Sequence, residues 1–103
     1  MTANGTTESW NVHLYRNLAL SVEWSGANAN TGVIELENSV DNINWNCYGG
    51  DAGAVTLNAA SGYQIFEVIN RASPYFRFKY TKNTVSAGTM IIRTYGTPLH
   101  RMT

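Results

Sequence analysis

Apolar and polar residues alternate along most of the chain. Residues 18–24 read LALSVEW, which places leucine, valine and tryptophan on one side and serine and glutamate on the other. Residues 75–82 read YFRFKYTK and alternate aromatic with basic side chains. A two-residue period predicts β-strands that are buried on one face. The pattern therefore favours an all-β protein.

Short strands are expected wherever this alternation lies between turns rich in glycine, asparagine and serine. The expected strands are residues 11–16, 18–24, 33–38, 44–50, 54–58, 63–70, 75–82 and 89–96. Their spacing of about 10 residues and their aromatic and β-branched content predict a single antiparallel β-sandwich or jelly-roll-like domain. We expect this domain at residues 11–98, a flexible N-terminal arm at 1–10 and a loose C-terminal tail at 99–103.

The core is expected to be aromatic, because the chain has three tryptophans, six tyrosines and three phenylalanines. The side chains expected to be buried are Trp24, Ile34, Leu36, Trp45, Phe66, Phe78, Tyr80 and Ile92. Cys47 is the only cysteine, so the chain forms no internal disulfide. It shares the parity of Trp45, and we expect it to be a buried structural residue.

Residues 35–50, ELENSVDNINWNCYGG, combine carboxylates with a tryptophan and so raise the question of a ligand site. Alternation places Glu35 and Glu37 on the solvent face and Trp45 inside. Ser39 and Asp41 have side chains that hydrogen-bond to nearby backbone amides and build turns. The segment is interpreted as a hairpin that positions a core tryptophan.

The charges balance overall but are separated along the chain. All seven acidic residues precede residue 70, where Arg16 is the only base, so residues 1–70 carry a formal charge of −6. The other six bases lie in residues 71–103, which carry +6. One interpretation is that acidic and basic strands neutralise each other within the fold. The other is that acidic and basic faces meet in an assembly.

Catalytic and metal chemistry have little support. The two histidines, His13 and His100, lie in a predicted edge strand and in the tail, and no serine stands in a G-x-S-x-G context. Of the carboxylates that could bind calcium, Glu35 and Glu37 lie about 7 Å apart on the solvent face of a strand, and Asp41 lacks the flanking acidic pattern of a calcium loop. We expect no enzyme activity, no metal and no cofactor.

The basic and aromatic residues bear on whether the chain binds nucleic acid or a glycan. Arg77, Lys79 and Lys82 share a strand with aromatic residues, but these point to the opposite face, so we expect no nucleic-acid binding. The chain shows neither a signal peptide at its start nor the roughly 18 apolar residues of a spanning helix, and no membrane partner is expected. A glycan that stacks on Tyr48, Tyr63 or Tyr95 stays open as an alternative.

Residues 18–95 resemble small structural proteins of tailed bacteriophages that have a β-sandwich fold. The resemblance rests on a glycine-led strand, a Ser-x-Asp turn and a tryptophan, followed by an aromatic strand with arginine and tyrosine and then a strand that opens with glycine. The matching residues are Gly32, Ile34, Leu36, Ser39, Asp41 and Trp45, then Tyr75, Arg77, Tyr80, Gly88 and Met90. Asn38 and Asn42 depart from the pattern, although asparagine at 42 tolerates the left-handed conformation of a turn.

The resemblance implies a non-enzymatic virion component, made in the bacterial cytoplasm. It would be a capsid decoration protein or an accessory subunit of the head or tail, present as a homo-oligomer that packs against capsid or tail proteins. Its N-terminal arm would either anchor it to the particle or be a frayed chain end. The candidate interaction surface is formed by Arg77, Lys79, Lys82, Glu35 and Glu37. The alternative is a carbohydrate- or receptor-binding β-sandwich module.

Overall fold

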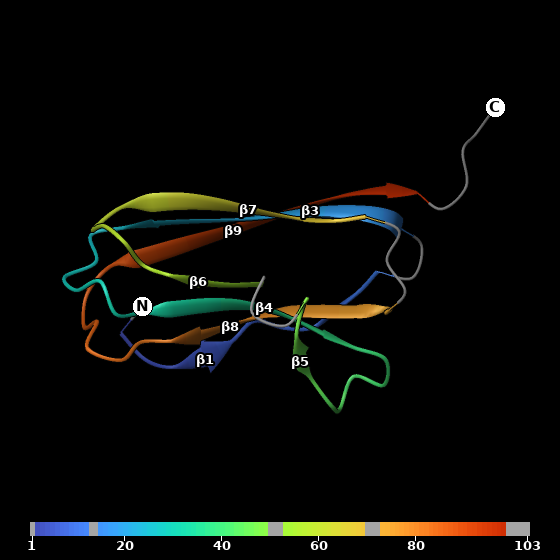
Figure 1. Cartoon of the computed structure of the whole chain (residues 1–103), viewed down its shortest axis with the longest axis horizontal. Coiled ribbons are helices and arrows are strands. Elements are labelled where there is room, and N and C mark those ends of the chain that lie inside the picture. The colour runs from blue at the N-terminus through green and yellow to red at the C-terminus, as the bar shows by residue number, and fades with distance from the viewer. Residues whose placement is uncertain (1, 13–14, 50–52, 70–72, 99–103) are drawn as a thin grey trace.

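Two antiparallel β-sheets stack face to face in the computed structural model, which describes residues 2–12, 15–49, 53–69 and 73–98 (Figure 1). The described residues form nine strands and no helix. The prediction of an all-β antiparallel sandwich is confirmed. The predicted tail at 99–103 lies outside the described residues.

The larger sheet has two long central strands with short strands at its edges. β4 (Val33–Ser39) pairs with β8 (Tyr75–Thr81) in continuous antiparallel register. β1 (Gly5–Thr6) and β2 (Trp10–Asn11) flank β8, whereas β5 (Asn46–Cys47) and β6 (Ala54–Thr56) flank β4. We call this the six-stranded sheet.

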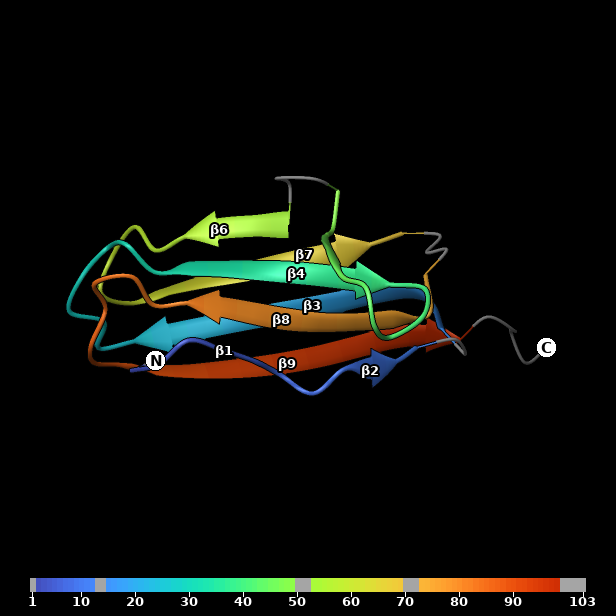
Figure 2. The same ribbon diagram turned by 90° about the horizontal axis from the view of Figure 1, so that it is seen from below.

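The three-stranded sheet has the order β7-β3-β9. β3 (Tyr15–Ser25) is the central strand, between β7 (Gly62–Val68) and β9 (Thr89–Pro98). β9 follows β3 over its whole length, with one register shift between Tyr15 and Asn17 (Figure 2). Sequence alternation placed β3 correctly, because Leu18, Leu20 and Val22 are all buried.

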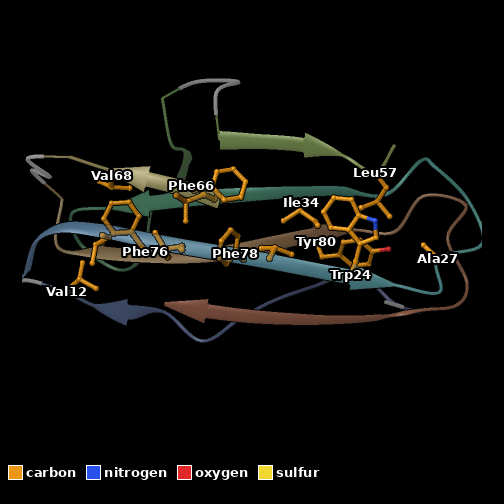
Figure 3. Close-up of a cluster of buried hydrophobic side chains, with 14 of the residues drawn as sticks. Val12, Trp24, Ala27, Ile34, Leu57, Phe66, Val68, Phe76, Phe78 and Tyr80 are labelled. Carbon is orange, nitrogen blue, oxygen red and sulfur yellow. The ribbon is translucent and has the colours of Figure 1, made fainter. Parts of the chain in front are cut away.

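The core lies between the two sheets and is built from inward-pointing residues of both (Figure 3). Of the side chains expected to be buried, Trp24, Ile34, Leu36, Phe66, Phe78 and Tyr80 are buried. The Trp24 indole donates a hydrogen bond to the Ala59 carbonyl (3.1 Å), and its ring lies against the backbone of Gly62, where a Cβ would clash with it. Glycine is therefore required opposite this tryptophan.

Three of the core predictions are wrong in whole or in part. Ile92 packs against the core but is only half-buried, because β9 is an edge strand. Trp45 and Cys47 are also half-buried, since they belong to the short hairpin that leaves the sandwich after β4. Alternation does not continue through this hairpin, so the parity argument fails there.

The N-terminal residues form part of the sheet instead of a flexible arm. β1 and β2 both pair with β8, and between them the Thr7 amide donates to the Phe78 carbonyl at 2.9 Å. The Phe78 amide in turn donates to the Thr7 hydroxyl at 3.0 Å, and the Lys82 amide donates to Asn4 Oδ1 at 2.8 Å. These contacts provide hydrogen-bond partners for backbone groups along one edge of β8, which would otherwise lack a neighbouring strand.

Candidate functional site

The outer face of the six-stranded sheet carries the predicted acidic and basic residues in opposed pairs. Antiparallel register places Glu37 opposite Arg77 and Glu35 opposite Lys79. Arg77 Nε donates to Glu37 Oε1 at 2.7 Å, and Glu37 is only 7% exposed. The prediction that Glu37 lies on the solvent face is therefore wrong: it points outward from the core, but it is covered.

Trp45 provides part of that cover. Its ring lies over the guanidinium of Arg77, with 4.2 Å between the Arg77 Cζ atom and the ring centroid. A cation above the face of an indole is attracted by the ring quadrupole. The tryptophan predicted for the core thus packs on the outer face of the sheet, where its ring covers the Glu37–Arg77 ion pair.

The turn before Trp45 is held by its own side chains. The Ser39 hydroxyl accepts from the Asn42 amide at 2.9 Å and donates to Asp41 Oδ1 at 2.9 Å. Asp41 Oδ1 also accepts from the amides of Ile43 (2.9 Å) and Asn44 (2.8 Å). The Asn44 and Ile43 amides, with the Asn44 and Ser39 side chains, hold the pKa of Asp41 well below its usual range. Asn42 has φ 62°, a left-handed conformation that asparagine tolerates.

The remaining residues of the sequence motif at 32–45 have packing roles. Leu36 is fully buried in the core. A Cβ at Gly32 would lie 3.0 Å from Leu57 Cδ1 and 3.0 Å from the Tyr80 hydroxyl, so the glycine allows these two side chains to approach the backbone. Gly32, Leu36, Ser39, Asp41 and Trp45 therefore build the β4–β5 region.

Two ion pairs within the described ranges connect the acidic part of the chain to the basic part. They are Arg77–Glu37, and Arg93–Glu23 at 3.2 Å across β9 and β3. Both join an acid from residues 1–70 to a base from residues 71–103. At these two positions the charge separation along the sequence is neutralised within the fold. Of the predicted interaction surface, Lys79 stays exposed and Lys82 is half-buried.

The outer face of the three-stranded sheet is different, because large apolar side chains are exposed on it. Tyr63 (56% exposed) and Ile65 (49%) lie on β7, and Ile91 (50%) and Tyr95 (71%) lie on β9. We call these four residues the apolar face. Ile65 lies opposite Ser21 and Tyr95 opposite Ala19, whereas Tyr63 and Ile91 lie on either side of Glu23. The small residues Ala19 and Ser21 leave a shallow hollow of about 190 Å³, which Tyr63, Ile65 and Tyr95 help to line.

Strand register gives the dimensions of this hollow. Tyr63 lies opposite Glu23, and Tyr95 lies opposite Ala19 on the other side of β3. The two tyrosines are therefore at diagonal corners, roughly 10 Å apart across the strands and roughly 13 Å apart along them. Arg93 also lines the hollow, where Glu23 holds its guanidinium.

Sequence reasoning did not identify Ile65 and Ile91 as surface residues. A signal was present, because both occupy the outward parity of their strands: Phe66 and Val68 are buried beside Ile65, and the half-buried Met90 and Ile92 flank Ile91. A strand with large apolar residues on both parities indicates that both faces are apolar. A second exposed apolar pair, Val40 and Ile43, lies at the tip of the β4–β5 turn.

Other chemistry is sparse in the part of the chain that the structure describes. Histidine, cysteine and acidic side chains do not gather there in groups of three that could hold a metal ion. The same ranges contain no helix with the length and apolar content needed to cross a bilayer. His13 and His100 lie outside the described residues.

No protein-family model, no curated protein and no solved structure matches the chain.

Proposed function

We propose that this chain is a non-enzymatic assembly subunit of a tailed-bacteriophage particle, a capsid decoration protein or a head or tail accessory protein. The apolar face carries this proposal. The phage setting rests on the sequence resemblance at residues 18–95.

An apolar sheet face is a reason to expect a partner protein. In antiparallel sandwiches the outer face is usually polar, with the apolar residues turned toward the core. Contiguous exposed apolar patches mark interaction sites in soluble proteins. Here two tyrosines and two isoleucines stand on β7 and β9, and no other strand among the described residues lies over this face (Figure 1). Aromatic side chains of this kind supply much of the binding free energy in protein interfaces.

Co-sedimentation with purified particles of the phage that encodes the chain tests the proposal. The double variant Ile65→Ser/Tyr95→Ala removes apolar contact area without touching the core, and we expect it to lose particle binding. The matched control is Val40→Ser/Ile43→Ser, which removes two exposed apolar side chains from the β4–β5 turn. If the apolar-face variant sediments with particles as well as the unmodified chain does, the proposal is wrong.

Salt dependence gives a second test. Because both ion pairs are formed within the chain, association through the apolar face should change little between low salt and about 0.5 M salt. A steep loss of particle binding with salt would instead indicate contacts between charged surfaces.

The second candidate is a glycan-binding module, and the hollow between Tyr63 and Tyr95 favours it. Exposed tyrosine rings can stack on sugar rings, while Ser21 and Arg93 offer polar groups beside them. A glycan array distinguishes the two candidates. Glycan binding that is lost in both Tyr63→Ala and Tyr95→Ala, together with no particle binding, would support the second candidate over the first.

A further inference from the structure

We propose that a second copy of this chain pairs with the free edge of β9, so that two three-stranded sheets join into one continuous sheet across a two-fold axis. This inference concerns a strand edge and goes beyond the apolar face on which the proposed function rests.

β9 has a long edge on which none of the described strands pairs. It runs for ten residues, pairs with β3 on one side, and is the last strand of its sheet among the described residues. A strand edge of this kind presents a row of N–H and C=O groups to any chain that can pair with it. Proteins commonly block such edges with charges, prolines or bulges. Within β9 the only charged residue is Arg93, which Glu23 holds, and Pro98 stands at the very end.

The other edges of the sandwich are less suited to pairing. On the side of β9, the six-stranded sheet ends in β1 and β2, which have two residues each and are separated by residues 7–9, outside any strand (Figure 2). On the opposite side it ends in β5 and β6, with two and three residues. β7 is the only comparable edge in the described ranges; it has seven residues and carries Glu67.

Two apolar hollows lie beside β9 on this side of the sandwich. One of about 230 Å³ is lined by residues that include Trp10, Val12, Tyr15 and Tyr95. The other, of about 180 Å³, is lined by residues that include Phe78, Met90 and Ile92. Both are bounded by β9 and by the N-terminal edge strands, so they mark a seam where the core is incompletely covered. A strand added to β9 would cover this seam and bury apolar surface.

A second copy fits this edge for reasons of symmetry and charge. An antiparallel strand pairs with itself about a two-fold axis, which gives a closed dimer and no further growth. The net charge of zero means that copies do not repel each other. The register is also constrained, because an axis at Arg93 would place two guanidinium groups directly opposite each other. An axis at Thr94 instead places Arg93 of each copy opposite Tyr95 of the other, an arrangement suited to a cation–π contact.

Analytical ultracentrifugation of the full chain over a concentration series provides the first test. We expect a monomer–dimer equilibrium, which Ile91→Lys weakens by at least about tenfold in dissociation constant. The matched control is Ile65→Lys: both isoleucines lie on the same outer face and are equally exposed, but Ile65 is on β7. We expect Ile65→Lys to leave the dissociation constant within about twofold. Circular dichroism and thermal unfolding establish that both variants fold.

Each other outcome overturns the inference. Equal weakening by both variants would place the contact on the apolar face, and weakening by Ile65→Lys alone would place it at β7. A chain that stays monomeric at about 100 μM, a concentration far above the dissociation constants of specific dimers, would exclude self-pairing. Because particle binding is measured separately, an unmodified chain that binds particles but forms no dimer would refute this inference and leave the proposed function standing.

A disulfide test then fixes the register. In a Cys47→Ser background, Thr94→Cys would place two cysteines opposite each other on the axis, where paired Cα atoms about 4.5–5.5 Å apart are within disulfide range. We expect oxidation to convert most of this variant to covalent dimer. Ile65→Cys in the same background is the control and should stay monomeric on a denaturing gel. Equal cross-linking of both variants would show random collision and contradict the register.

Discussion

The two outer faces of the sandwich differ in how completely the chain covers them. On the six-stranded sheet, Glu37 pairs with Arg77 and the ring of Trp45 lies over the guanidinium. On the three-stranded sheet, Tyr63, Ile65, Ile91 and Tyr95 are exposed, and no later segment of the described chain folds over them. One face has a covered ion pair, and the other leaves four large apolar side chains exposed around the Glu23–Arg93 pair.

The difference shows that outward polarity alone does not define a functional surface. Charged outward residues on β4 and β8 suggested an interaction surface, yet strand register pairs them and the β4–β5 hairpin covers one pair. Apolar outward residues on β7 and β9 have no such compensation. We therefore expect the six-stranded face to contribute mainly to stability and the three-stranded face mainly to binding.

Arg77→Met should have the largest effect on folding. It removes the guanidinium and leaves the covered Glu37 carboxylate without its ion-pair partner, at a cost of about 2 kcal/mol in the free energy of unfolding. The expected loss is smaller than for a fully buried ion pair, because the Arg77 side chain is 25% exposed and water screens its charge. Urea unfolding measures the loss. The double variant Glu37→Leu/Arg77→Met should recover at least about half of it, and a double variant that is less stable still would contradict this account.

Trp45→Ala should lower the free energy of unfolding by about 1 kcal/mol, through loss of the cation–π contact and of the cover over Glu37. Tyr95→Ala, on the open face, should change it by less than about 0.5 kcal/mol, because an exposed side chain contributes little to folding. Thermal and urea unfolding of both variants test the contrast. A larger loss for Tyr95→Ala than for Trp45→Ala would reverse the roles assigned to the two faces.

The Asp41 turn should make stability depend on pH in the acid range. Because the pKa of Asp41 is lowered in the folded chain, the folded state favours the ionised carboxylate. Its contribution is complete above the unfolded pKa of about 4 and is lost as the pH falls below that value. The melting temperatures of the unmodified chain and of Asp41→Asn should therefore differ by a constant amount between pH 5 and 8 and should converge below about pH 4. A gap that is independent of pH would show that the charge has no part in holding the turn.

Glu23→Gln should have the smallest effect. The Arg93–Glu23 pair is largely exposed, at 60% and 49% of the two side chains, so water and salt screen it. We expect a change of less than about 0.5 kcal/mol in the free energy of unfolding, which disappears near 0.5 M salt. An effect as large as that of Arg77→Met would mean that the open face is also stabilised by its ion pair.

The strands and the sandwich were predictable because alternation is a local property. β3, β4, β7, β8 and β9 all lie within a few residues of their predicted positions. The β4–β5 turn was equally local, since Ser39 and Asp41 bond to amides no more than three residues away. β1 was missed because it contains only two residues and shows no period of its own, and the strand expected at 11–16 overlaps β2 at Asn11 alone.

Trp45 marks the limit of the sequence argument. Its parity and size predicted a core residue, but in the folded chain the core is filled by aromatic side chains of the regular strands, namely Trp24, Phe66, Phe76 and Phe78. The short hairpin then placed Trp45 on the opposite side of the sheet. Parity along a strand does not say which way a side chain points after a turn, and this depends on the partner strand.

The sequence by itself determined the class of fold, the two-residue alternation of the long strands and the turn at residues 39–44, because each depends on neighbouring residues. Tertiary structure decided which strands lie side by side. It therefore decided that Glu37 meets Arg77 beneath Trp45, that the N-terminus closes one edge of β8, and that β9 is left at an edge. Pairing between strands far apart in the chain depends on how whole sheets bury their apolar sides, and no local pattern encodes that choice.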